Sequence, residues 1–252
     1  ISLYSDLPVK FRLQLQRILH EFQINYGLVK PEALFERVDW QHQYARWNVF
    51  GFVIDHLWCL RASNILDLEL VGLKREDTQN WGWWHRLAVP VKGVTKYSHI
   101  SPINSLRGPY AETYYRFQMK RFAIILNKYL ALKDQRCLAL YELLMQTEGF
   151  EAMLEQSKEM DKIEGSNQLG VPIPFFRSDG TLLWMYELSV AIPGDQGLQL
   201  VIWSPVDNDS SEYLADLRRQ AMAKSSEAER TLFIEDFAHH FSDKERLALG
   251  VS

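Results

Sequence analysis

The sequence predicts an α+β fold, in which a five-stranded antiparallel sheet carries a large helical insertion and is flanked by helices at both ends. Three observations predict it. Strand-like runs at 47–61 and 174–204 are separated by a long helical pattern over 109–160. Asp179-Gly180 marks a hairpin between two alternating runs. With 252 residues, of which 47% are apolar, the chain can bury such a core.

The N-terminal residues are predicted to be helical. Apolar side chains recur at helical spacing over 9–25, and Lys30-Pro31-Glu32 opens a second short helix that reaches about Trp40. We expect 1–46 to form a packed cap, or a dimerisation and linker segment.

The first strand pair follows this segment. Trp47–Ile54 and Leu57–Arg61 are β-rich runs around a tight turn at Asp55-His56. Ile65–Leu73 is predicted to be a short helix, and 74–108 a long irregular connection. The sequence therefore predicts a strand hairpin that turns directly into a helix.

The second half is predicted to contain helices, then a three-strand meander, then helices again. Helices are expected over 109–132, 134–146 and 150–160, strands over 174–177, 181–191 and 198–204, and helices over 208–224 and 226–247. The predicted domains are a helical segment at 1–46, the sheet domain at 47–224 and a C-terminal helical extension at 225–252.

Two stretches carry a family resemblance. "VIDHLWCLRASNILDLELVG" resembles the opening of a PAS domain, in which an Asp turn links two strands and a small-residue-Asn step leads into the first helix. Asn64 can cap the helix that starts at Ile65. "FFRSDGTLLWMYELSVAIPGDQGLQLVIWSPVDNDSSEYLADL" resembles the closing strands of the same fold.

The segments between them, "NWGWWHRLAVP" and "CLALYELLMQTEGFEAML", make residues 47–220 similar to the ligand-binding domain of MmyB-like transcription regulators. This resemblance implies a pocket between the sheet and the inserted helices, and an apolar, fatty-acyl ligand. The expected pocket-lining residues are Phe52, Trp58, Leu60, Arg61, Phe122, Leu126, Trp184, Tyr186, Leu200 and Ile202. The alternative is that these side chains fill the core.

Polar residues near this predicted pocket suggest further roles. Arg61, Arg86 and His85 are candidates to meet a ligand carboxylate at the pocket mouth. His56 and His99 are candidate haem ligands, although only their presence supports that role. For each of these residues, a surface or packing role is the competing interpretation.

Other motifs favour a binding module over an enzyme. Glu235 with His239 and Asp236 with His240 have a spacing that can hold a metal on a helix, but a third ligand is missing nearby, so we expect an exposed face and no metal. The sequence contains no nucleophile elbow, phosphate loop or zinc motif. We therefore expect no enzymatic activity.

Composition restricts location and partners. The net charge of −4 argues against direct nucleic-acid binding, and no apolar run is long enough to span a membrane. Cys59 and Cys137 are expected to be buried thiols in a reducing compartment, so we expect a cytoplasmic protein.

Two functional hypotheses follow. The first is a homodimeric sensory module of a transcription regulator, which binds a small apolar ligand and reaches DNA only through a domain upstream of this chain. The second is a protein-interaction module with a filled core, which uses Trp81, Trp83 and Trp84 as exposed anchors.

Overall fold

The computed structural model describes residues 40–46, 48–71, 85–86, 111–146, 150–159, 172–177, 179–192, 197–226 and 230–251. The chain divides into two compact units, Ile1–Trp47 and Asn48–Ser252. The described part of the first unit is helix α3, Trp40–Arg46. The helix predicted over 9–25 lies outside the described residues. The second unit contains the sheet.

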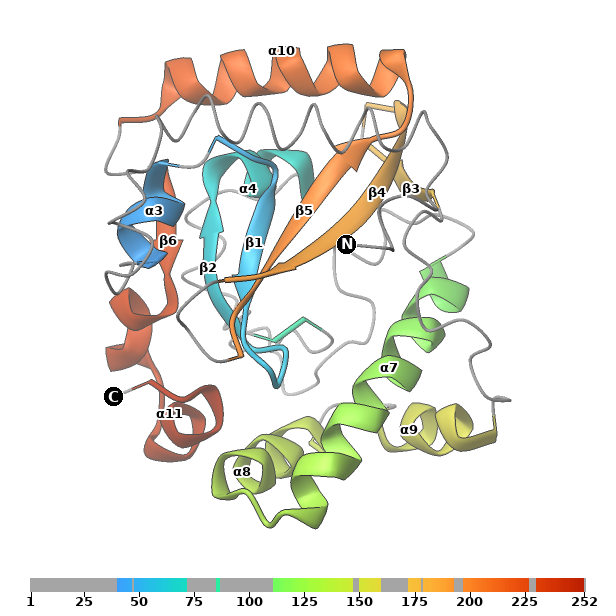
Figure 1. Ribbon diagram of the computed structural model, residues 1–252, viewed down its shortest axis with the longest axis vertical. Helices are drawn as coiled ribbons and strands as arrows, with labels where there is room; N and C mark the ends of the chain where they lie inside the picture. Colours follow the sequence, from blue (N-terminus) through green and yellow to red (C-terminus); the bar gives the residue numbers. More distant parts are fainter. Residues whose placement is uncertain are drawn as a thin grey trace, which may run out of the picture. The chain divides into compact units, whose positions relative to one another are not determined.

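The described strands form one six-stranded antiparallel sheet in the order β3-β4-β5-β1-β2-β6 (Figure 1). They are β1 (Gly51–Ile54), β2 (Leu60–Asn64), β3 (Ile173–Phe176), β4 (Leu182–Ala191), β5 (Gln199–Pro205) and β6 (Thr231–Phe233). Pairing of β1 with β5 joins the early hairpin to the late meander. The predicted strand number of five is wrong, because β6 is added at the β2 edge.

The helices of this unit lie close to their predicted positions, except at the C-terminal end. They are α4 (Ile65–Val71), α7 (Ala111–Ala131), α8 (Gln135–Leu144), α9 (Phe150–Glu159), α10 (Asn208–Lys224) and α11 (Asp243–Leu249). Asp207 caps α10 by accepting a hydrogen bond from Ser210 N–H at 2.7 Å. Among the described helices, none combines the length and the apolar character that a membrane crossing requires.

Local hydrogen bonds explain the β1–β2 hairpin and the start of α4. Asp55 Oδ1 accepts hydrogen bonds from the N–H groups of Leu57 (2.9 Å) and Cys59 (3.1 Å), which closes the predicted turn. Asn64 Oδ1 accepts a hydrogen bond from Asp67 N–H at 2.9 Å. The predicted capping role of Asn64 is therefore confirmed.

The single helix predicted over 226–247 is wrong. This region contains strand β6, a 3-10 helix η4 (Ile234–His240) and the short helix α11. Leu232 pairs with Ser63 on β2, so the apolar residues that suggested a helix extend the sheet instead. Pairing with an available strand edge outweighs local helix preference here.

The strand register separates the sheet into two faces. Phe52 of β1 pairs with Val201 of β5. Trp203 lies two residues further along β5 and pairs with Glu187 of β4. The side chains of these four residues therefore lie on the same face of the sheet, which is called the inner face below. Helix α4 lies against this face, since Asp67 Oδ1 accepts a hydrogen bond from Trp203 Nε1 at 3.1 Å. The buried core includes Phe52, Leu68, Phe122, Phe175, Trp203 and Leu214.

Candidate functional site

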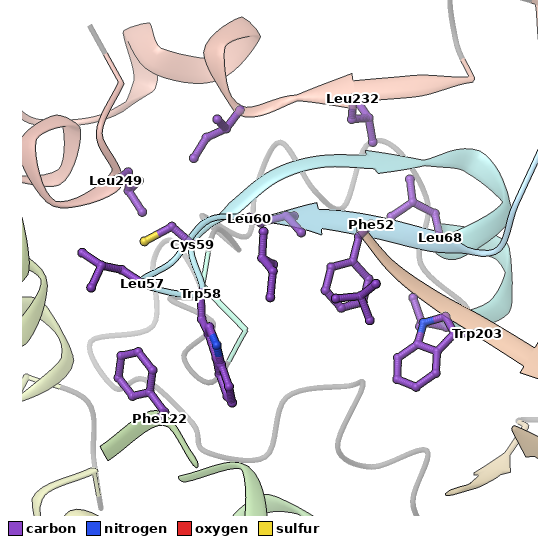
Figure 2. Close-up of a cluster of buried hydrophobic side chains, with 14 of the residues drawn as sticks. Phe52, Leu57, Trp58, Cys59, Leu60, Leu68, Phe122, Trp203, Leu232 and Leu249 are labelled. Atoms are coloured by element: carbon purple, nitrogen blue, oxygen red, sulfur yellow. The ribbon is translucent and has the colours of Figure 1, made fainter. Parts of the chain in front are cut away.

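Trp58 is the centre of the candidate site. It lies in the turn between β1 and β2, has a positive φ of 63° and is 4% exposed. Its ring lies 5.5 Å from the ring of Phe122 on α7, and Figure 2 shows the two side chains facing each other. The hairpin turn and the inserted helix therefore meet at this aromatic pair.

Two guanidinium groups flank the Trp58 ring. The centre of the Arg86 group lies 5.0 Å from the ring centroid and that of Arg121 lies 5.6 Å away, distances at which cations are attracted to an aromatic ring. Arg86 is positioned by its backbone, because Arg86 N–H donates to Trp58 O at 3.1 Å. A backbone bridge between His85 and Cys59 holds the same segment against β2.

A carboxylate completes this arrangement. Glu187, on the inner face of β4, accepts a hydrogen bond from Arg86, and it also accepts one from the Tyr114 hydroxyl at 2.9 Å. Arg121 Nη1 lies 3.8 Å from the other carboxylate oxygen of Glu187. The side chains of Arg86 and Glu187 are each 10% exposed. Trp58, Arg86, Tyr114, Arg121, Phe122 and Glu187 are called the Trp58 cluster below.

The Arg86–Glu187 pair is ionised. Burial disfavours both charges, but attraction and hydrogen bonding outweigh it, so the pKa of Arg86 lies above its usual value and the pKa of Glu187 lies below its usual value. Burial, followed by repulsion from Arg86, lowers the pKa of Arg121. The surroundings therefore favour the charged form of Arg86 and disfavour that of Arg121.

The ten predicted pocket residues do not share one surface. Phe52, Leu60, Trp58, Phe122 and Leu126 belong to the buried core, and the first two lie on the inner face. The register places Trp184, Tyr186, Leu200 and Ile202 on the opposite, outer face.

Arg61 lies apart from both sets. It has no partner across the β1–β2 ladder because of a bulge there. Its guanidinium donates to Leu249 O at 2.6 Å and lies 3.2 Å from Glu235 Oε1. Arg61 therefore contacts the C-terminal segment instead of the Trp58 cluster.

The histidines have structural surroundings. A ring nitrogen of His85 lies 3.0 Å from Leu57 O, and burial lowers the pKa of His85 to about 4, so its ring is neutral at neutral pH. The His56 ring packs against Tyr129, with centroids 4.8 Å apart. His99 lies outside the described residues.

The Glu/His motif near the C-terminus lies on η4, a 3-10 helix, instead of an α-helix. Glu235 pairs with Arg61, and Asp236 accepts a hydrogen bond from Phe233 N–H at the start of η4. The rings of His239 and His240 lie 3.9 Å apart. Within the described ranges, no three His, Cys, Asp or Glu side chains are grouped closely enough to bind a metal.

Both cysteines are buried free thiols, as predicted. Burial raises the pKa of Cys137 to about 11 and that of Cys59 further, so neither thiol is activated. Trp81, Trp83 and Trp84, the anchors of the interaction hypothesis, lie outside the described residues.

Sequence reasoning missed Glu187, Tyr114 and Arg121. A signal for Glu187 was present: it shares a strand face with Leu183 and Met185, both buried, and a charged residue in such a row requires a partner. Tyr114 and Arg121 carry no comparable signal, because polar residues are common along a helix that is predicted to be partly exposed.

Neither family models nor curated sequences place this chain in a known family. No protein-family model matches the chain. No curated protein sequence matches it. Function must therefore be inferred from the geometry around Trp58 and from the sequence pattern.

Proposed function

We propose that the chain is the sensory, PAS-like ligand-binding module of a transcription regulator, and that it binds a small, mainly apolar ligand beside the Trp58 cluster. Pairing of β1 with β5 supports the PAS-like part, because it joins the early hairpin and the late meander around a helical insertion, as the sequence resemblance implies. Helix α7 of that insertion supplies Tyr114, Arg121 and Phe122 to the cluster.

The conformation of Trp58 carries the proposal. A φ of 63° is in the left-handed region, which costs an ordinary residue about 1–2 kcal/mol. Such strained conformations are concentrated at ligand and functional sites. A buried ring beside convergent charged groups also suits an apolar ligand with one polar end.

Signalling would follow from where such a ligand binds. A molecule packed against Trp58 and Phe122 touches both the sheet hairpin and α7. If it binds one packing of α7 more tightly than another, binding shifts the chain toward that packing. In the proposed cytoplasmic homodimer, this change is passed to a DNA-binding domain upstream of the module.

The test measures fatty-acid binding by the 252-residue chain after removal of co-purified lipid. Tetradecanoate is titrated against a bound fluorescent fatty acid, 11-(dansylamino)undecanoate, and displacement is recorded. We expect saturable displacement from the wild-type chain. Trp58→Ala should weaken it by about tenfold, since an aromatic contact contributes about 1 kcal/mol beyond its buried area.

Trp184→Ala is the matched control, because Trp184 lies on the outer face. Its affinity for tetradecanoate should equal that of the wild-type chain. Equal weakening by the two substitutions would contradict a site beside Trp58. If the wild-type chain shows no saturable displacement, the ligand-binding proposal fails and the protein-interaction hypothesis is favoured.

A further inference from the structure

His56 lies where the β1–β2 turn meets both the β4–β5 turn and helix α7. Its ring lies 4.8 Å from the ring of Tyr129, near the end of α7. In the β4–β5 turn, a Cβ added at Gly197 would lie 3.1 Å from His56 Nδ1, so the backbone there is in close contact with the ring. His56 is only partly buried, so protons from the solvent can reach it. A change in its charge therefore acts on the contact between the sheet and the inserted helices.

Four charged side chains act on His56. The two carboxylates are Asp55, the preceding residue, and Asp134, the N-cap of α8. The two cations are Arg61 of β2 and Arg136 of α8. Asp55 closes the β1–β2 turn through Oδ1 and pairs with Arg136 through Oδ2. A positive charge on His56 would compete with Arg136 for Asp55, and this pair is the one that ties the turn to α8.

Helix α7 adds a further cation to these surroundings. Lys128 Nζ lies 5.3 Å from the centroid of the Tyr129 ring, a distance at which an ammonium group is attracted to the ring. A protonated His56 would be a second cation beside the same ring. Burial, together with Arg136 and Arg61, outweighs the attraction of the carboxylates, so the pKa of His56 lies below its ordinary value of 6.5. The junction therefore favours the neutral ring.

We propose that His56 is a proton-sensitive contact, and that its protonation weakens the packing of α7 and α8 against the β1–β2 turn. Histidine is the side chain whose charge ordinarily changes between about pH 5 and 8. At pH 8 the ring is neutral whether the junction is closed or open. As the pH falls below 6.5, the open form takes up a proton first, so acidification favours opening. The inference goes beyond the proposed function, because this input to the inserted helices requires no ligand.

The test measures amide hydrogen exchange of the 252-residue chain at pH 8 and pH 5.5. Protection factors are compared for the end of α7 and the start of α8, since these factors correct for the pH dependence of intrinsic exchange. His56→Phe keeps an aromatic ring beside Tyr129 but cannot be protonated. Other titrating groups, such as Asp67 and His85, act equally in both chains.

We expect the ratio of wild-type to His56→Phe protection to fall by about twofold or more between pH 8 and pH 5.5, since a difference of one pKa unit corresponds to a factor of ten. His239→Phe is the matched control, because His239 is an exposed histidine of η4. Its protection factors should follow those of the wild-type chain at both pH values.

The charge network is tested with Asp134→Asn. This substitution removes a carboxylate that favours the protonated ring, and asparagine can still cap α8. The titration midpoint of His56, followed by NMR through its ring Cε1 proton, should therefore move to lower pH than in the wild-type chain. A midpoint that stays in place or moves to higher pH would contradict the charge coupling.

Two results would overturn the proposal. One is the same pH dependence of protection in the wild-type chain and in His56→Phe. The other is a wild-type His56 midpoint at or above pH 6.5, and this measurement decides the point even if His56→Phe does not fold. Neither result affects the proposed ligand binding, which is measured by displacement at one fixed pH.

Discussion

At the scale of single residues, the positive φ of Trp58 leads to a stability prediction that is independent of any ligand. Trp58→Ala and Trp58→Gly remove the same ring, but glycine adopts φ 63° without steric cost. We expect the Trp58→Gly variant to be about 1 kcal/mol more stable than the Trp58→Ala variant. In helices and strands the order is reversed, because glycine there lowers the stability of the protein relative to alanine. Urea unfolding measures the difference. An alanine variant that equals or exceeds the glycine variant in stability would contradict the strain at Trp58.

Asp67 predicts a pH dependence of stability. This carboxylate is 1% exposed and accepts hydrogen bonds from Ser63 Oγ and Trp203 Nε1, yet burial raises its pKa to about 6. Between about pH 4 and pH 6 the folded chain therefore holds a proton that the unfolded chain, with an ordinary pKa of 3.8, has released. The associated stability is present below pH 4 and is lost as the pH rises through about 6.

Asp67→Asn removes this titration and keeps an oxygen that accepts from Trp203 Nε1. Relative to the variant, we expect the wild-type chain to lose about 2–3 kcal/mol between pH 4 and pH 7, at 1.4 kcal/mol per pKa unit. Urea unfolding at several pH values measures the difference, and Glu212→Gln, at an exposed position of α10, is the control. Parallel pH profiles for the wild-type chain and Asp67→Asn would contradict the raised pKa.

Individual residues of the site were only partly predictable. Arg86 was expected to meet a ligand carboxylate, but it meets Glu187, which is 101 positions away in the sequence. Local spacing contains no information about a contact at that separation. Asn64, by contrast, acts on Asp67 three positions later, and its role as a cap was predicted correctly.

At the scale of elements, the β1–β5 pairing depends on a glycine. A Cβ on Gly51 would lie 2.2 Å from Val201 O, a backbone atom that cannot move without disturbing the ladder. We expect Gly51→Ala to separate β1 from β5 and to lower the free energy of unfolding by about 1–3 kcal/mol, as for other over-packed sites. Urea unfolding measures the loss.

Ser189→Ala is the matched substitution on a neighbouring strand. Ser189 is an exposed β4 residue that faces Val201 across the β4–β5 ladder, so its replacement should change the stability by less than about 0.5 kcal/mol. A Gly51→Ala variant that is as stable as Ser189→Ala would show that the close approach of the two backbones is not required.

Elements were predicted best where their signals are local and long. The α10 range and the β3–β5 meander follow sustained periodic patterns and a hairpin turn. β6 has three residues, too few for a period of two to be recognised, and its pairing partner lies far away on β2. Its apolar residues therefore matched a helical period equally well.

At the scale of the whole molecule, the sequence indicated that the early hairpin and the late meander share a sheet, but it did not indicate which face encloses the site. Along β4, Trp184 and Tyr186 alternate with Leu183 and Met185, so both faces read as apolar. The register of the five antiparallel strand pairings determines which side chains lie on each face. Glu187 lies on the inner face, where it pairs with Arg86 of the Trp58 cluster.

Arg136 connects distant parts of this molecule. From α8 it pairs with Asp55 in the β1–β2 turn and donates to Ala248 O and Leu249 O, each at 3.0 Å. Gly250 also lies close to the Arg136 side chain, because a Cβ added at Gly250 would be 2.7 Å from Arg136 Nε. Its φ of 68° is in the left-handed region. The side chain of Asp55 is 5% exposed, so removing Arg136 leaves a buried carboxylate whose remaining cation, Arg61, is 4.0 Å away.

We therefore expect Arg136→Met to lower the free energy of unfolding by about 3–5 kcal/mol, as for other broken buried pairs, and to release the C-terminal segment. Cys59 lies under this segment, with Sγ 3.9 Å from Ala248 O, so its reaction with a thiol reagent should accelerate. Arg219→Met, which breaks an exposed pair on α10, should change neither quantity. Unchanged Cys59 reactivity in Arg136→Met would mean that other contacts, such as the hydrogen bond from Arg61 to Leu249 O, hold the C-terminal residues in place.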